Sequence, residues 1–176
     1  GKKYMFWGSF RGIYATELTD NGLEIKKKTD GTPVLKKRIC GNRFEGTNIY
    51  KRGEYYYLFA SIGTCCNGAT STYQTVVGRS KNVLGPYLDK TGRDMLYDYC
   101  EIIMSGNETW AGPGHNSILI QDDVGTDWII YHGYKKKEAE NGRYVLMDKL
   151  IWSNDGWPSV KSNAPSILEV APYFQK

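Results

Sequence analysis

Three segments of the 176-residue chain repeat one pattern, and this repeat restricts the possible fold more than any other feature. Each segment has a turn glycine, a short polar stretch, a run of large apolar or aromatic residues, and then small residues. The pattern occupies residues 1–9, 53–61 and 125–133. It is typical of a buried β-strand that leaves a hairpin turn, so the sequence predicts the same hairpin at three places.

A second set of turn signals follows each segment, at residues 20–23, 83–87 and 154–158. Each module therefore holds one strand pair, a loop and a second strand pair. The composition of 14 Tyr, 5 Trp and 20 Gly fits an all-β protein, because Tyr and Trp favour strands and Gly favours turns. A repeated four-stranded antiparallel unit predicts β-propeller blades. The alternative is one β-sandwich whose turns are similar by coincidence.

The second and third modules have a further predicted strand ahead of the glycine, at residues 44–51 and 115–121. The first module has none, because the sequence begins at its turn. Propellers typically have four to eight blades, and these modules account for fewer. We therefore expect upstream sequence to be absent from this chain or to lie on a separate piece. The open blade edge is also a possible surface for self-association.

The charge pattern excludes some classes of partner. The net charge is +4, and the lysine runs at residues 26–28 and 135–137 lie in polar stretches. We interpret these runs as solvated loops and expect no nucleic-acid partner, because no nucleic-acid motif accompanies them. The longest apolar runs are only a few residues long, so no membrane span is expected.

The chain has four cysteines, and their spacing argues against a zinc site. No Cys-x-x-Cys pair occurs among Cys40, Cys65, Cys66 and Cys100. An even number suits disulfides in a small secreted chain, but this chain is large enough to do without them. Adjacent cysteines bond only with strain. The sequence therefore leaves the redox compartment open.

Most acidic residues of the chain fall in turns, charged loops or a long connection. Glu45 differs from them because it begins a predicted inner strand. Inner strands of a propeller line the central channel, where burial and aromatic neighbours favour the protonated form of a carboxyl group. A protonated carboxyl group donates the proton in glycoside cleavage, which also needs a second carboxylate. The alternative is a structural glutamate bound to a backbone amide.

Three further features are weaker candidates for a binding site. His115 occupies the corresponding point of the third module and, with carbonyls and waters, could hold a hard cation, or it could be a hydrogen-bonded core residue. The loop at 63–68, with Cys65 and Cys66, is small and glycine-rich, so it could approach a ligand or be an ordinary turn. Arg79 ends a strand and could clamp a ligand hydroxyl or pair with an acid.

Eight short motifs run in one order over nearly the whole chain. They are Trp7-Gly8-Ser9-Phe10 with Gly12-Ile13, Phe44-Glu45-Gly46, Tyr55-Tyr56-Tyr57-Leu58-Phe59, residues 63–67 with Ser71-Thr72-Tyr73, Gly78-Arg79-Ser80, Gly85-Pro86-Tyr87, residues 112–116 and Asp155-Gly156-Trp157-Pro158. Together they resemble glycoside hydrolase family 43, and most of all its endo-α-1,5-arabinanase branch. One such motif would be weak, but eight in order are specific.

The resemblance implies a five-bladed β-propeller, with this chain covering about the last two and two-thirds blades. It implies one partial catalytic domain over residues 1–176. In this division, residues 1–40 are the remainder of one blade, 41–110 are the next blade and its connection, and 111–176 are the last blade and C-terminal tail.

The family uses an aspartate base, a second aspartate that tunes pKa and orients the sugar, and a glutamate general acid. Only the glutamate maps onto this sequence, at Glu45, and the two aspartates would lie upstream of Gly1. His115 matches the family's axial histidine, which in arabinanases lies by a calcium or similar ion. The resemblance implies one such ion and no organic cofactor. The expected sugar-facing residues are Ser9, Phe10, Thr47, Asn48, Cys65, Cys66 and Arg79.

The function expected from this resemblance is inverting hydrolysis of α-1,5-linked arabinan in plant cell walls. One alternative is a hydrolase of the same fold that acts on xylan or xylo-oligosaccharides. An alternative of another class is a non-catalytic propeller that binds glycans. The family also implies a secreted, periplasmic or cell-surface protein, although no signal peptide is visible in this sequence.

Overall fold

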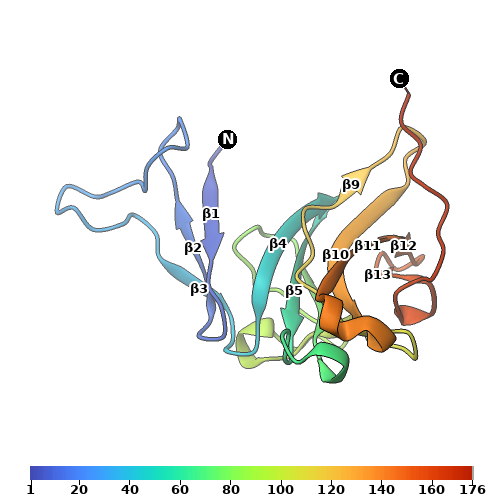
Figure 1. Cartoon of the computed structure of the whole chain (residues 1–176). Coiled ribbons are helices and arrows are strands. Elements are labelled where there is room, and N and C mark those ends of the chain that lie inside the picture. The colour runs from blue at the N-terminus through green and yellow to red at the C-terminus, as the bar shows by residue number, and fades with distance from the viewer. Residues whose placement is uncertain (176) are drawn as a thin grey trace.

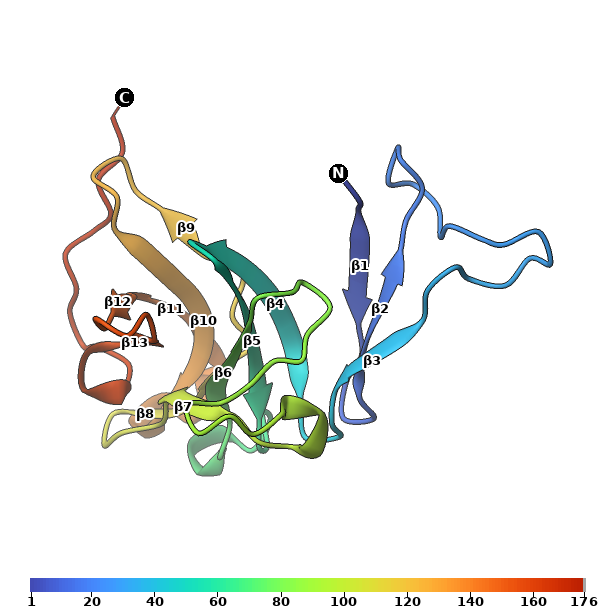
Figure 2. The same cartoon turned by 180° about the vertical axis from the view of Figure 1, so that it is seen from behind.

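The computed structural model describes residues 1–175, and they form β-sheets that stand side by side (Figures 1 and 2). The first sheet has three antiparallel strands in the order β1-β2-β3. The second has four, in the order β4-β5-β6-β7. The strands are β1 (Tyr4–Trp7), β2 (Ile13–Glu17), β3 (Lys37–Cys40), β4 (Glu45–Arg52), β5 (Tyr55–Ile62), β6 (Gln74–Ser80) and β7 (Glu101–Met104).

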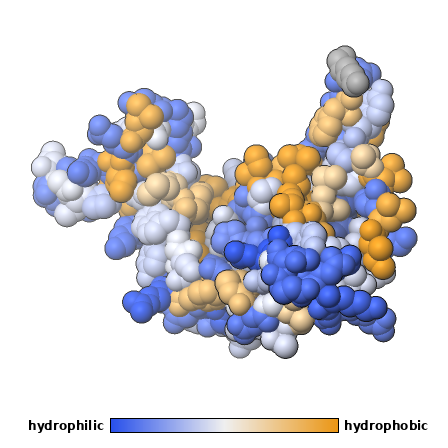
Figure 3. Space-filling view, viewed as in Figure 1, coloured by the Kyte–Doolittle hydropathy of each residue, from blue (hydrophilic) through white to orange (hydrophobic). Residues whose placement is uncertain are grey.

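The third sheet has the order β11-β10-β8, with the short strand β9 paired to β10, and a separate two-stranded hairpin follows it. These strands are β8 (Trp110–Gly114), β9 (Ile120–Gln121), β10 (Asp127–Lys135), β11 (Arg143–Lys149), β12 (Ile151–Trp152) and β13 (Pro158–Ser159). Four short 3-10 helices lie in connections: η1 (Gly68–Thr70), η2 (Met95–Tyr97), η3 (Lys136–Asn141) and η4 (Lys161–Asn163). Figure 3 shows hydrophilic residues gathered over the region of η3, which contains part of the second lysine run.

The all-β, propeller-type prediction is confirmed, because consecutive strands build consecutive antiparallel sheets, as in propeller blades. One local prediction was wrong. Residues 115–121 do not form one strand, because β8 ends at Gly114 and only Ile120–Gln121 pairs again. The hairpin turn after β4 is Gly53-Glu54, since Arg52 still pairs with Tyr55.

Strand β5 explains why the sheets pack together. Its side chains alternate between two faces, and both faces are buried. Leu58, Ala60 and Ile62 belong to a core cluster shared with the first sheet, whereas Tyr57 and Phe59 belong to a cluster shared with the third sheet. A strand buried on both faces needs an almost continuous apolar run, which is what residues 55–62 supply.

Two further features of the described residues are an unpaired strand edge and the lack of a membrane-spanning helix. Among residues 1–175, β1 pairs only with β2, so its other edge has no strand partner. Within the same residues, no helix has the length and apolar character needed to cross a membrane.

Candidate functional site

The ends of the three sheets converge on one pocket of about 300 Å³. The end of β1 and the turn after it supply one wall, the beginning of β4 supplies the second, and the residues after β8 supply the third. The pocket is lined by Phe6, Trp7, Gly8, Ser9, Glu45, Gly46, Thr47, His115 and Asn116. Glu45 is the only acidic side chain among these described lining residues, and it lies on the middle sheet.

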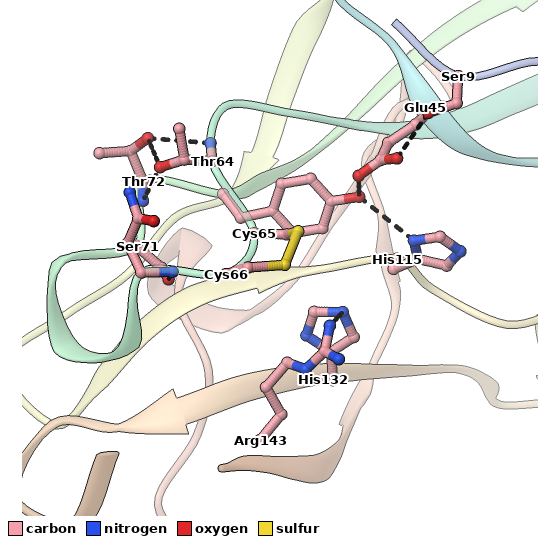
Figure 4. The surroundings of a disulfide bond; sticks show 12 residues. Ser9, Glu45, Thr64, Cys65, Cys66, Ser71, Thr72, His115, His132 and Arg143 are labelled. Atoms are coloured by element: carbon pink, nitrogen blue, oxygen red, sulfur yellow. Dashed lines mark hydrogen bonds between the residues drawn. A yellow bond between two sulfur atoms is a disulfide. The ribbon is translucent and has the colours of Figure 1, made fainter. Parts of the chain in front are cut away.

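Two hydroxyl groups hold the Glu45 carboxylate. Ser9 Oγ donates to Oε2 at 2.9 Å from the first sheet, and the Tyr73 hydroxyl donates to Oε1 at 2.6 Å from just before β6 (Figure 4). Each carboxylate oxygen therefore has a fixed partner, and rotation of the carboxylate is restricted. Tyr73 is fully buried, so its hydroxyl is a rigid contact.

The Tyr73 hydroxyl also lies 3.3 Å from His115 Nδ1. Burial, followed by the hydrogen bond to Glu45, raises the pKa of Tyr73 well above its usual value, so the hydroxyl keeps its proton. When Glu45 is ionised, this hydroxyl donates to it. When Glu45 is protonated, the hydroxyl can accept from it and donate to an unprotonated Nδ1. The Tyr73 hydroxyl, together with His115 Nδ1, can therefore form a hydrogen bond with Glu45 in either of its protonation states.

Two glycines allow these side chains to approach so closely. A Cβ on Gly46 would lie 3.1 Å from the His115 ring, and Gly46 also has a φ of +61°. A Cβ on Gly114 would lie 2.4 Å from the Tyr73 ring. His115 itself has a φ of +52°, which is uncommon for a residue other than glycine and is often found at functional sites.

His132 lies behind the site, on β10. Its ring stacks on Tyr73 with a centroid distance of 5.8 Å and on His115 at 6.1 Å. Burial, and then the nearby Arg143, lower the pKa of His132 to about 4, so the ring is neutral at ordinary pH. Its Nδ1 is buried without a hydrogen-bond partner among the described residues. A neutral, stacked ring supports Tyr73 without adding a charge beside Glu45.

Cys65 and Cys66 form a disulfide with each other in the loop after β5. Figure 4 shows this disulfide in the same region as Glu45, His115 and His132. The thiols Cys40 and Cys100 are free. Because adjacent cysteines close almost no loop, the chain-entropy contribution of this disulfide to stability is small. The bond therefore constrains only the loop that carries it.

The structure brings together only some of the predicted site residues. Ser9, Glu45, Thr47 and His115 share the pocket, whereas Phe10, Asn48, Cys65, Cys66 and Arg79 are not among its lining residues. Arg79 lies in a different pocket, and its Nη1 donates to the carbonyl oxygen of Asp155 at 2.6 Å. Arg79, predicted as part of the sugar-facing wall, therefore lies apart from the Glu45 pocket.

Sequence reasoning assigned no role to three residues of the site. Tyr73 stood inside a matching motif, but nothing in the sequence related it to Glu45. Asn116 follows His115 directly, and its buried Oδ1 has no partner among residues 1–175. His132 alternates with apolar residues on a strand, a pattern that usually indicates packing rather than chemistry.

Comparison with known proteins identifies the family. The model of the glycosyl hydrolases family 43 matches residues 1–158 of the chain. The protein belongs to glycosyl hydrolase family 43. The prediction from the eight motifs is thereby confirmed.

Two curated relatives share substantial identity with this chain. The extracellular exo-α-(1→5)-L-arabinofuranosidase ArbA of Cellvibrio japonicus is 45% identical over 170 residues, which cover 91% of this chain and 48% of ArbA. The extracellular endo-α-(1→5)-L-arabinanase 1 of Bacillus subtilis is 36% identical over 161 residues, covering 90% of this chain and 47% of that protein. The chain spans about half the length of these curated relatives.

Solved structures of arabinanases have the same fold. An exo-1,5-α-L-arabinanase from a bovine ruminal metagenomic library has a TM-score of 0.78 and 35% identity, covering 92% of this chain and 53% of that one. The Cellvibrio cellulosa α-L-arabinanase complexed with arabinohexaose has a TM-score of 0.75 and 34% identity, covering 92% of this chain and 54% of that one.

Proposed function

We propose that the protein hydrolyses α-1,5-linked arabinan by inversion, with Glu45 as the general acid. The observation that carries this proposal is the position of Glu45, held by Ser9 and Tyr73 in a pocket where three sheets of a family 43 fold converge. A general acid needs such a fixed carboxyl group within reach of the leaving oxygen. The names of the relatives support arabinan as the substrate.

Inverting hydrolysis also needs a carboxylate base roughly 6.5–9.5 Å from the acid. No second acidic side chain lines the Glu45 pocket in the part of the chain that the structure describes. We therefore propose that the base comes from a part of the propeller outside these residues. This fits the fact that the relatives are about twice as long as the matched region.

The test is sugar release from linear arabinan and from xylan, by the 176-residue chain and by a form extended at its N-terminus. If only the extended form cleaves arabinan, the result supports arabinan as the substrate and a catalytic base outside the 176-residue chain. Cleavage by the short chain would overturn the external base. Cleavage of xylan instead would favour the xylanolytic alternative, and the product sizes would distinguish exo from endo action.

The non-catalytic alternative makes a different prediction from the same materials. A glycan-binding propeller would bind arabinan oligosaccharides, keep this affinity after Glu45→Gln, and release no sugar in its extended form. Binding without cleavage would therefore overturn our proposal.

We also propose a calcium ion beside His115. Asn116 Oδ1 and Thr47 Oγ1 line the same pocket and are buried without partners among the described residues, and such oxygens suit a hard cation. Residues 1–175 contain no cluster of three or more His, Cys, Asp or Glu that could hold a metal. Waters would have to complete the ligand set around these residues. When bound, the ion would supply positive charge near the sugar.

Calcium is expected to raise the melting temperature of the protein. An ion that binds only the folded state at about 100 times its Kd adds roughly 2.7 kcal/mol to the free energy of unfolding. Scanning calorimetry with calcium and with a chelator measures the effect. His115→Ala should remove the dependence on calcium, and equal melting temperatures of the parent protein in both buffers would contradict the site.

Tyr73→Phe is expected to lower kcat of the arabinan-hydrolysing form by roughly 10- to 100-fold, because a hydrogen bond to a charged group contributes about 1.5–3 kcal/mol. The pH profile of kcat should shift as well, since the lost hydroxyl contacts Glu45. Tyr57→Phe is the matched control, because its buried hydroxyl bonds to Gly156 instead. Similar losses of kcat in both variants would indicate a general effect on folding.

Location and partners follow from the same family argument. We propose that the protein is secreted, periplasmic or on the cell surface, because both named relatives above are described as extracellular. Its proposed partners are a plant cell-wall polysaccharide or oligosaccharide and either the remaining part of the propeller or a second copy at the open edge of β1.

A further inference from the structure

A second pocket, the outer pocket, lies at the other end of the middle sheet. It has a volume of about 490 Å³, and its walls include Tyr55, Arg79, Lys81, Lys90 and Trp157. It shares no lining residue with the Glu45 pocket. Glu45 pairs with Ser61 at one end of β5, and Tyr55 is at the other end, so roughly 20 Å of strand separates the two pockets.

A fixed arginine, Arg79, lines the outer pocket. The Arg79 guanidinium lies 4.5 Å from the Tyr55 ring centroid and 4.5 Å from that of Trp157. Its Nη1 donates to the Asp155 carbonyl oxygen, and it forms no ion pair with a carboxylate among residues 1–175. A guanidinium held between two rings has lost most of its rotamer freedom already, so binding an anion costs it little entropy.

Two lysines add positive charge around this arginine. Lys81 Nζ lies 5.8 Å from the Tyr55 ring centroid, and Lys90 Nζ lies 5.9 Å from that of Trp157. Lys81 has a partner in Glu54 at 3.4 Å, but both side chains are largely exposed, so this pair is weak.

The acidic group in the wall is already neutralised. Asp89 is buried, and its Oδ2 accepts from Arg93 Nε at 2.8 Å. Its Oδ1 accepts from the hydroxyl and backbone N–H of Thr91 and from the backbone N–H of Arg93. Its charge therefore repels an incoming anion only weakly, and the lining residues include three cations, Arg79, Lys81 and Lys90, against this one carboxylate.

The walls also offer an apolar surface. The half-buried ring of Tyr55 and the side chains of Pro86 and Leu88 line the same space as the three cations. A ligand that matches both features has a carboxylate for the planar guanidinium and a flat C–H face for the ring. A uronic acid unit of an oligosaccharide has both, and the volume lies in the range of small-molecule sites.

We propose that the outer pocket binds an acidic saccharide, with Arg79 paired to the carboxylate of a uronic acid unit. This binding needs no hydrolysis at Glu45. It would attach the protein to an acidic polysaccharide at a point remote from the Glu45 pocket.

The test is isothermal titration of the protein with trigalacturonate, with neutral arabinotriose and with sulfate, each measured at low and high NaCl. Trigalacturonate should bind more tightly than either other probe, and its Kd should rise with salt. Arg79→Lys should raise this Kd at least tenfold, because lysine keeps the charge but lacks the bidentate fork. The Lys81→Ala/Lys90→Ala variant, whose exposed positions leave the core intact, should also raise it.

Two control variants show whether binding depends on the outer pocket itself. Lys27→Ala/Lys28→Ala removes the same number of charges from a loop of the first sheet and should leave the Kd unchanged. Glu45→Gln should also leave it unchanged, so failure of the hydrolysis proposal would not affect this result. Equal affinity for arabinotriose or for sulfate, no binding of trigalacturonate, or loss of binding in either control variant would overturn the proposal.

Discussion

Glu45→Gln is expected to lower hydrolysis of linear arabinan by roughly 10²- to 10⁴-fold in the form of the protein that cleaves it, which is the range for loss of a general acid. Glutamine keeps the shape of the side chain, and its oxygen can accept from one of the two hydroxyls of Ser9 and Tyr73 while its NH₂ group donates to the other, so the pocket should stay intact. It cannot supply the proton that the leaving oxygen needs. Reducing-sugar release at matched enzyme concentration measures the loss.

Two comparisons distinguish a lost proton donor from a damaged fold. An aryl arabinofuranoside with a nitrophenolate leaving group needs little protonation, so Glu45→Gln should reduce its cleavage much less than that of arabinan. Glu54→Gln is the matched control, since Glu54 is exposed in the turn that follows β4. Arabinan hydrolysis by Glu45→Gln within a few-fold of the parent would exclude Glu45 as the general acid.

Asp127→Ala is expected to lower the free energy of unfolding by about 3–5 kcal/mol, the usual cost of breaking a buried charged network. Asp127 is buried at the start of β10, and its Oδ1 accepts from the Tyr50 hydroxyl at 2.9 Å and from Gln121 Nε2 at 3.0 Å. Its Oδ2 accepts from Trp152 Nε1 at 2.7 Å and lies 3.5 Å from Arg52 Nε. One carboxylate thus links the second sheet, the third sheet and the hairpin β12–β13.

Urea denaturation, with a check that the m-value stays constant, measures this loss. Burial, and then its bond to Asp127, raises the pKa of Tyr50 to about 12, so this hydroxyl keeps its proton. In the variant the half-buried hydroxyl loses the acceptor that Asp127 supplies. Asp127→Asn should cost less, because an amide oxygen can still accept. Asp20→Ala, in an exposed turn, is the control and should stay within about 0.5 kcal/mol. A loss from Asp127→Ala as small as the control's would show that the network contributes nothing.

Much of the fold could be predicted because its determinants are local. The turn glycine before each short apolar run identifies a hairpin strand without any knowledge of its neighbours. The continuous apolar run in β5 indicated a buried strand, and the structure has it between two core clusters. The strand predicted at residues 115–121 failed because His115 adopts a positive φ that ends the extended backbone.

The candidate site was predictable only in part. Glu45 and His115 were selected because each lies at the start of a predicted inner strand, and the structure places both in one pocket. Arg79 was grouped with them because it lies on the same module. A strand has two ends, however, and Arg79 lies toward the end remote from Glu45, where Tyr55 and Trp157 hold it.

The sequence by itself determined the repeated hairpins, the family and the position of the candidate acid, because turn residues, apolar runs and motif order are properties of the chain. Only the tertiary structure decided that Tyr73, 28 residues from Glu45, is its hydrogen-bond partner, and that Arg79 belongs to a separate cationic pocket. The physical reason is that strand register and sheet packing decide which side chains meet. Neither depends on how far apart two residues lie in the sequence.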